Sequence, residues 1–208
     1  MADNNVLLSE GDNAVNRSEE NLLDSSPPGQ FLQDIRAVTR RISHLIRHSK
    51  VEGPEQTVVD LLHLALSIES AFSVWYRGHA LANSRGEHNL KRWAESAAHD
   101  AEAIAQRLQE ITGKKEYQGE WLPSMKSPPA VDQWHSPKTF GDERDAQRLA
   151  LVGYERLVRF MQKHDPPTAA LLKGIADGRE ERLADLTYRL SHPALKLGSS
   201  FSSSSRRR

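Results

Sequence analysis

The sequence predicts an all-α protein, and three observations lead to this fold class. Apolar residues recur at three- and four-residue steps, the period of an amphipathic helix, along four long stretches of the chain. No stretch of consequence shows the alternating pattern of a strand. The connections within the first and the last pair of stretches are short, whereas the connection between the pairs is long. Four helices with one long middle crossover form a recurrent bundle topology.

The predicted bundle spans residues 54–192. Its helices are expected over about residues 56–83, 89–112, 142–164 and 168–191. Pro54 opens the first helix, because proline fits the first turn of a helix, where its missing N–H is not needed. Gly113 ends the second helix, because glycine readily adopts the left-handed conformation that closes a helix. Short antiparallel connections are therefore expected within each pair of helices.

Residues 114–140 are predicted to be the crossover. This segment is rich in proline and has little periodicity, and a connection of this length is uncommon in a compact domain unless it spans a distance or carries a function. We expect it to pack along the outside of the bundle, with Trp121 and Trp134 as its anchors.

Charge is unevenly distributed before the bundle, although the whole chain is neutral, with 28 basic and 28 acidic residues. Residues 1–29 carry six acidic residues and one arginine and are predicted to be a disordered tail. Residues 30–50 are predicted to form a basic amphipathic helix, and residues 193–208 a flexible serine- and arginine-rich tail. The apolar side of this helix holds Phe31, Ile35, Val38, Ile42 and Leu45, and its basic side holds Arg36, Arg40, Arg41 and Arg47.

Two interpretations of the basic helix stay open. It packs on the bundle and leaves its arginines in solvent, or the arginines bind an anionic partner such as DNA or lipid. A terminal cluster of Arg206, Arg207 and Arg208 is a further candidate for contacts with phosphate groups.

Composition excludes several classes of function. The chain has no cysteine, which excludes disulfides, thiolate catalysis and cysteine-type zinc sites. The polar N-terminus lacks the pattern of a signal peptide, and no apolar run approaches the length of a membrane span. We therefore expect a cytoplasmic protein without a membrane-spanning segment.

Glu69 is the most informative single residue. It lies on the apolar stripe of the first bundle helix, which also holds Leu62, Ala65, Leu66, Phe72 and Tyr76. A carboxylate on such a stripe faces the core, where an unpaired charge costs several kcal/mol, about 3–5 when a partner is removed. A metal ion or a cationic side chain must compensate it.

Three stretches of the chain resemble helices of the ferritin superfamily. Residues 61–71 resemble the first helix of bacterioferritins, and residues 104–113 are similar to the end of the second helix in bacterioferritins and Dps-type mini-ferritins. Residues 175–186, with Glu180 and Glu181, resemble the acidic last helix. The resemblance covers residues 56–191 and implies a ferritin-like four-helix bundle that assembles into homo-oligomers.

The resemblance also implies where a di-iron ferroxidase site would lie, because the family uses a Glu from two helices and an E-x-x-H pair from each of the other two. Glu69 matches the first of these ligands. The remaining family positions correspond to Ala97, Asp100, Gly153, Arg179 and Arg182. The position of the haem-binding Met of bacterioferritins corresponds to Ala98, so no haem is expected. The standard di-iron site is therefore expected to be lost.

Three hypotheses for Glu69 follow. Arg179, with Arg182 one turn further, provides the positive charge that iron would supply, so that Glu69 and Arg179 form a buried ion pair. Alternatively, Glu69 belongs to an atypical iron site, or it is solvated at the end of the bundle. Candidate ligands for atypical metal sites, including one between subunits as in mini-ferritins, are Glu69, Asp100, Glu102, His79 and His88.

The sequence thus favours a ferritin-like protein that lacks ferroxidase activity and acts as a structural or interaction protein. Two alternatives are an iron-binding ferritin with a displaced site and a Dps-like protein that binds DNA.

Overall fold

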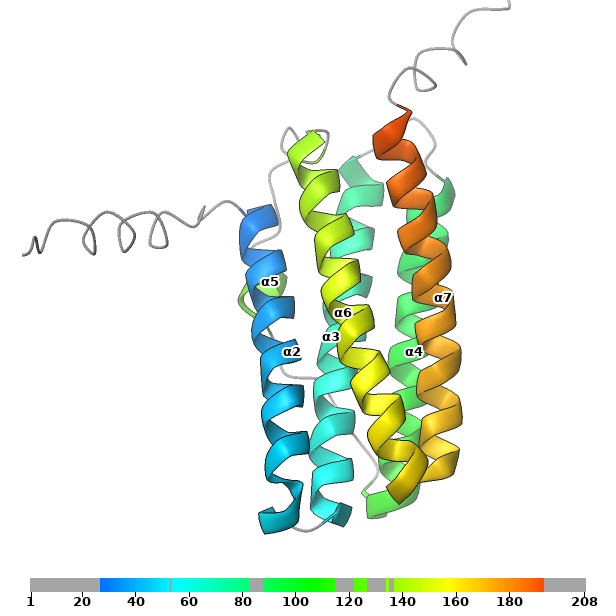
Figure 1. The fold of residues 1–208 in the computed structure, drawn as a ribbon. Helices are drawn as coiled ribbons and strands as arrows, with labels where there is room; N and C mark the ends of the chain where they lie inside the picture. Colours follow the sequence, from blue (N-terminus) through cyan, green and yellow to red (C-terminus); the bar gives the residue numbers. More distant parts are fainter. Residues whose placement is uncertain are drawn as a thin grey trace, which may run out of the picture.

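The computed structural model describes residues 27–52, 54–82, 88–114, 122–126, 134 and 137–192. This part of the chain is all-helical and contains no strand, as predicted (Figure 1). Its helices are α2 (Pro27–Glu52), α3 (Pro54–Ala82), α4 (His88–Thr112), α5 (Pro123–Lys126), α6 (Pro137–His164) and α7 (Pro166–Ser191). The predicted C-terminal tail, residues 193–208, lies outside the described residues, as does the predicted N-terminal tail except for residues 27–29.

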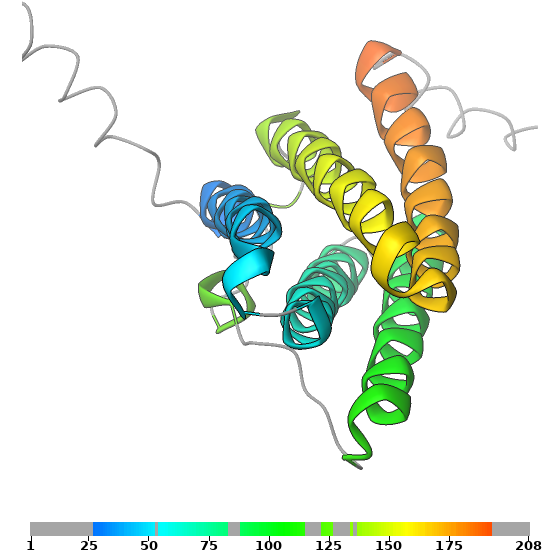
Figure 2. The same cartoon turned by 60° about the horizontal axis from the view of Figure 1, so that its bottom comes forward.

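The long helices pack side by side with their axes roughly aligned (Figures 1 and 2). Helix α3 contacts α4 and α6, and α7 contacts α4 and α6. Helices α3 and α4 run in opposite directions, as do α6 and α7 (Figure 1). Helix α4 ends at the bottom of Figure 1 and α6 begins at the top, so the chain between them passes from one end of the molecule to the other.

Helix α2 packs against α3 and α6 through its apolar stripe. Phe31, Ile35, Val38 and Ile42 are buried, whereas Arg40, Arg41 and Arg47 are exposed. This agrees with the interpretation in which the helix packs on the bundle and leaves its arginines in solvent. The helix is longer than predicted, because residues 27–29 of the predicted tail form its first turn, which begins at a proline.

The ends of the bundle helices follow local chemistry. Gly113 closes α4 with a φ of 71° and donates its N–H to the Gln109 carbonyl oxygen at 2.8 Å. Asp165 caps α7 by accepting a 3.4 Å hydrogen bond from the Thr168 backbone N–H, and its carboxylate also accepts a 2.6 Å hydrogen bond from the Thr168 hydroxyl. Helix α6 begins at Pro137, earlier than the predicted residue 142, because its first turn buries Thr139 and Phe140 against the core.

Trp134 anchors the crossover, as predicted. Its side chain is 2% exposed, and its ring lies 4.6 Å from the Trp75 ring and 5.0 Å from the His79 ring. A Cβ atom at Gly78 would lie 2.9 Å from Cζ2 of Trp134, so the indole needs a glycine at this point of α3. Trp121, the other predicted anchor, lies outside the described residues.

Helix α5 attaches the crossover to α2. The Ser124 backbone N–H donates a 2.7 Å hydrogen bond to the Asp34 carboxylate, which is buried on α2. Short as it is, α5 contacts α2 and α3. The described part of the crossover therefore lies against the outer helix α2 as well as against the bundle.

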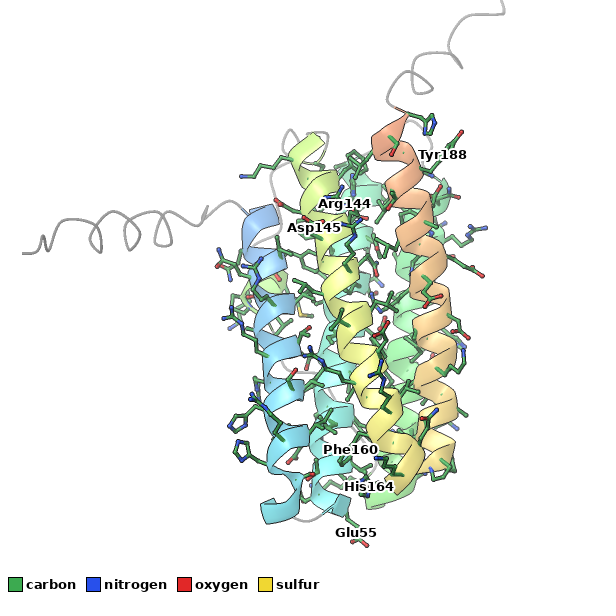
Figure 3. All side chains as sticks on the ribbon, viewed as in Figure 1. Glu55, Arg144, Asp145, Phe160, His164 and Tyr188 are labelled. Carbon is green, nitrogen blue, oxygen red and sulfur yellow. The ribbon has the colours of Figure 1, made fainter. Side chains whose placement is uncertain are left out.

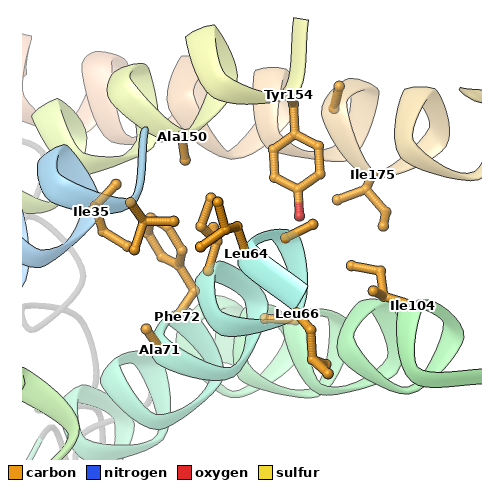
Figure 4. Packing of buried hydrophobic residues seen from close by; sticks show 14 of the residues in the cluster. Ile35, Leu64, Leu66, Ala71, Phe72, Ile104, Ala150, Tyr154 and Ile175 are labelled. Carbon is orange, nitrogen blue, oxygen red and sulfur yellow. The ribbon is translucent and has the colours of Figure 1, made fainter. Parts of the chain in front are cut away.

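Helix α3 is the central core helix. From Glu55 to Ala82 it is long and apolar enough to cross a membrane, and it is the one such helix in the described part of the chain. However, 72% of its most apolar 18-residue window is buried inside the protein, as expected for a core helix. Buried apolar residues of α2, α4, α6 and α7 pack with those of α3 in one cluster (Figure 4).

Candidate functional site

Glu69 lies within α3 and is fully buried. One of its carboxylate oxygens, Oε1, accepts hydrogen bonds from Arg179 Nε at 3.0 Å and Arg179 Nη2 at 2.5 Å. The same oxygen accepts a 2.5 Å hydrogen bond from the Tyr154 hydroxyl. The predicted contact between Glu69 and Arg179 is therefore present, and it is part of a larger network.

The Arg179 guanidinium is held on all sides, with 1% of the residue exposed. Its Nη1 donates a 2.7 Å hydrogen bond to Gln147 Oε1, and its Cζ lies 4.1 Å from the centre of the Phe72 ring. Burial alone would lower the pKa of Arg179, but the Glu69 carboxylate together with Tyr154 and Tyr76 more than offsets burial, so the pKa is raised. Arg179 therefore keeps its positive charge in the core.

Tyr154 reaches this network from α6 and points into the space between the helices (Figure 4). Burial raises the pKa of its hydroxyl well above the usual range, and the negative charge of Glu69 raises it further. The hydroxyl therefore stays protonated and acts as a donor to Glu69. Gln147 lies about two turns before Tyr154 on α6. It accepts a hydrogen bond from Arg179, and its amide nitrogen donates one to the buried Tyr76 hydroxyl.

A second ion pair, looser than the first, lies between α7 and α4. Arg182 Nη2 is 3.6 Å from Asp100 Oδ2, and Arg182 Nη1 donates a 3.0 Å hydrogen bond to Ser96 Oγ. Arg182 is 5% exposed. Burial raises the pKa of Asp100, the nearby Glu69 charge raises it further, and Arg182 and Arg179 only partly oppose them. The charged form of Asp100, which pairs with Arg182, is therefore disfavoured by burial and by the Glu69 charge.

A third pair joins the C-terminal part of α3 to the N-terminal part of α6. His79 Nδ1 lies 3.2 Å from Glu143 Oε2, and both side chains are fully buried. The imidazole also lies against Trp134 and Phe140. His79, which the sequence suggested as a metal ligand, is therefore engaged with a carboxylate of α6.

Gly153, on α6, is the position that the resemblance matches to the family's third-helix Glu. In the structure a Cβ at Gly153 would lie 3.5 Å from Ile42 Cδ1 and Thr39 Oγ1, so this side of α6 faces α2. Gln147 and Tyr154 approach the Glu69–Arg179 pair instead.

Sequence reasoning missed these partners on α6, although a signal existed. Buried positions on α6 recur at steps of three and four, namely Glu143, Gln147, Ala150, Tyr154, Leu157 and Met161. Three of these are polar, and polar residues on a buried stripe require partners. On α4, Ala97 is buried at 1% exposure, whereas His99 is exposed.

The structure does not assemble the alternative metal ligands in one place. Glu102 is exposed on α4, His79 is buried against Glu143, and the His88 side chain lies outside the described residues. Among the residues that the structure describes, no group of three or more His, Asp or Glu side chains could hold a metal ion. The proposed phosphate-binding residues Arg206, Arg207 and Arg208 also lie outside the described part of the chain.

In comparisons with known proteins, no protein-family model, curated protein or solved structure matches this chain. What the protein does must therefore be inferred from its own residues and their geometry.

Proposed function

We propose that this chain is a ferritin-like helical bundle whose metal site has been replaced by a protein ion pair, and that it acts as a structural or interaction protein. The carrying observation is the Arg179 guanidinium, 2.5 Å from the fully buried Glu69 carboxylate. In this proposal Arg179 supplies permanently the positive charge that iron would supply in a ferroxidase.

The direction of the helices supports the comparison with the superfamily. Two antiparallel pairs, α3 with α4 and α6 with α7, are joined by a connection that runs from the bottom to the top of Figure 1. A bundle with one such crossover is the ferritin-like arrangement. Helix α2 is an addition to this plan, because it covers α3 and α6 from outside.

The charge balance argues against a di-iron centre. Glu69 and Asp100 carry two negative charges, and Arg179 and Arg182 carry two positive charges in the same interior region. Two ferrous ions would bring four more positive charges into a cluster that is already neutral. Carboxylates are the ligands that hold such hard ions, whereas the α6 side chains that contact the Glu69–Arg179 pair are Tyr154, which bonds to Glu69, and Gln147, which bonds to Arg179.

A bundle of this kind is a stable structural unit, and its surface can take part in oligomer assembly and in contacts with other proteins. The network ties α3, α6 and α7 together within the core. By the resemblance to ferritins, we expect the 23.4 kDa chain to form homo-oligomers. Multi-angle light scattering of the purified protein measures the mass of the particle and tests this directly.

The loss of iron chemistry is tested by adding Fe(II) to the purified full chain in air and following oxidation by absorbance. We expect the rate to equal that of buffer and of the Glu69→Ala variant. Elemental analysis of the native particle should find no stoichiometric iron. Rapid oxidation that disappears in Glu69→Ala would instead establish a displaced ferroxidase site and overturn the proposal.

DNA binding is a second candidate function, favoured by the exposed arginines of α2, Arg40, Arg41 and Arg47. Arginine binds phosphate oxygens well, and such binding weakens steeply with salt. Salt-dependent retention of DNA by the full chain, weakened by removal of residues 199–208 or by Arg40→Gln with Arg47→Gln, would support it. Equal retention by these variants would exclude α2 and the terminal arginines as the DNA-binding surface.

A further inference from the structure

Four arginines gather along the outer side of α2, and no carboxylate of the described residues pairs with them. Arg36, Arg40 and Arg47 follow one another at helical spacing, and Arg156 of α6 joins them. Arg156 Nη1 contacts Ser43 Oγ, and Arg47 Nε donates to the Ser43 carbonyl oxygen at 3.2 Å. We call these four residues the basic row. Figure 3 shows side chains with nitrogen atoms projecting from α2 away from the other helices.

The basic row differs from the neighbouring surface of α6. There Arg144 and Arg148 lie within ion-pair distance of Asp145, and Arg159 lies near Glu155. None of the four arginines of the basic row forms an ion pair with a carboxylate of the described residues. Four guanidinium groups on one face attract an anion through charge and hydrogen bonds.

The surroundings of the basic row argue against a lipid surface. An interfacial helix needs an exposed apolar side to enter the membrane. The apolar side of α2 is already buried against α3 and α6, and none of the large exposed hydrophobic residues in the described part of the chain lies on α2.

We propose that the basic row binds the acidic segment of residues 10–24 of the same chain. This segment directly precedes α2 and carries Glu10, Asp12, Glu19, Glu20 and Asp24 against Arg17 alone. Because it is tethered at the start of α2, its effective concentration at the row is far above that of a free peptide. This inference does not depend on the proposed loss of iron chemistry.

The lengths of the segment and of the row match. Along α2, Arg36 and Arg40 lie about 14 and 20 Å from Pro27, and Arg47 lies about 30 Å away, at about 1.5 Å per residue. Glu19 is eight residues before Pro27 and reaches about 27 Å in an extended chain, whereas Asp12 reaches about 50 Å. Glu19 and Glu20 can therefore meet Arg36 and Arg40, and the acids before them can meet Arg47.

The contact is expected to be weak and sensitive to salt, because exposed ion pairs are screened by solvent. A bound segment would cover the arginines that an external polyanion needs.

Paramagnetic relaxation tests the contact on the full chain. The protein has no cysteine, so Ser18→Cys provides a single site for a nitroxide label. We expect loss of amide signal intensity on the outer side of α2 and near Arg156, with signals of α4 unaffected. The intensity should return at about 1 M salt, where the Debye length is about 3 Å.

Two sets of variants, each carrying the label, make the test specific. Arg36→Gln, Arg40→Gln and Arg47→Gln together should abolish the loss of intensity, as should Glu19→Gln, Glu20→Gln and Asp24→Asn in the segment. A matched control removes three exposed cations elsewhere, through Arg77→Gln, Arg92→Gln and Lys163→Gln, and should keep the loss.

Three outcomes would overturn the proposal: no loss of intensity on α2, a loss that persists at about 1 M salt, where the Debye length is about 3 Å, or a loss that survives in either set of variants. If the label leaves α2 unaffected while a short DNA duplex shifts the same amide signals, the basic row serves nucleic acid and the proposal is wrong.

Discussion

Glu69 and Arg179 lie where an unpaired charge costs several kcal/mol, about 3–5 when one partner of a buried pair is removed. Their pairing does not by itself stabilise the fold by that amount, because bringing both charges out of water has a cost of similar size. Each residue of the pair is therefore needed to compensate the buried charge of the other. It also fixes the relative positions of α3 and α7, which carry the two side chains.

This interdependence predicts the behaviour of a double-mutant cycle. Arg179→Met or Glu69→Leu alone should lower the free energy of unfolding by about 3–5 kcal/mol, because the other charge is left buried. The double variant should recover much of this loss. Recovery should be incomplete, because the Tyr154 hydroxyl and the Gln147 carbonyl would each lose a buried partner, at about 1–3 kcal/mol. Urea unfolding at pH 7 measures all four proteins.

The control for this cycle is the exposed pair Lys173–Asp177, whose atoms Nζ and Oδ1 lie 2.8 Å apart. Its removal through Lys173→Met and Asp177→Leu should change stability by about 0–1 kcal/mol. Mild and additive effects at Glu69 and Arg179 would mean that their side chains do not interact in solution.

A pH-dependent prediction concerns Asp100, whose pKa is raised in the folded protein by burial and by the Glu69 charge. A carboxyl with a raised folded-state pKa stabilises the fold fully below its unfolded pKa, and this contribution is lost as the pH rises through the folded pKa. Asp100→Asn removes the ionisation. We therefore expect the variant to be more stable than the parent at pH 7, and the difference to shrink as the pH falls.

Urea unfolding at pH 7 and at lower pH, together with an NMR titration of the Asp100 carboxyl, measures the effect. Asp177→Asn on the surface of α7 controls for general effects of the substitution. A destabilised Asp100→Asn protein at pH 7 would show that pairing with Arg182 outweighs burial, contrary to the direction of the pKa shift.

At the scale of elements, the crossover is attached to the bundle through a contact between an indole and a glycine. Trp134→Ala should lower the free energy of unfolding by about 3–5 kcal/mol, because a large buried side chain is lost. Gly78→Ala should also destabilise, because its Cβ would lie 2.9 Å from the indole. In the Trp134→Ala background the same change should become stabilising by up to about 1 kcal/mol, because alanine favours helix.

Gly174→Ala on α7 is the matched control, because a Cβ there meets nothing within 4 Å. It should stabilise the protein by up to about 1 kcal/mol in both backgrounds. If Gly78→Ala is equally harmless with Trp134 present, the indole is not packed on α3 in solution. Urea unfolding of the single and double variants decides between these outcomes.

Local sequence patterns were sufficient to predict most of the helices and failed where tertiary contacts decide. The helix ends at Gly113 and near Pro166 follow from backbone chemistry, which acts within a few residues. The true start of α6 at Pro137 depends on the burial of Thr139 and Phe140 by the core, which no local pattern shows.

For the whole molecule, the candidate site was predictable on α3 and α7 but not on α6. Helix α3 is buried on most sides and α7 has one dominant buried side, so the inward orientation of Glu69 and Arg179 could be inferred. Helix α6 buries two sides, one against α2 around Gly153 and one against the interior around Gln147 and Tyr154. A helical pattern cannot tell these sides apart, because it does not say which neighbour each side faces.

The position of α2 has a consequence for synthesis on the ribosome. The Thr39 hydroxyl of α2 donates a 3.3 Å hydrogen bond to the Leu149 carbonyl of α6, and the two residues are 110 positions apart. Because translation proceeds at about 5–20 residues per second, α2 emerges roughly 5–20 s before this partner exists. During that interval α2 has only α3 as a long neighbour, and the side that α6 later covers is open to chaperones that bind apolar helices.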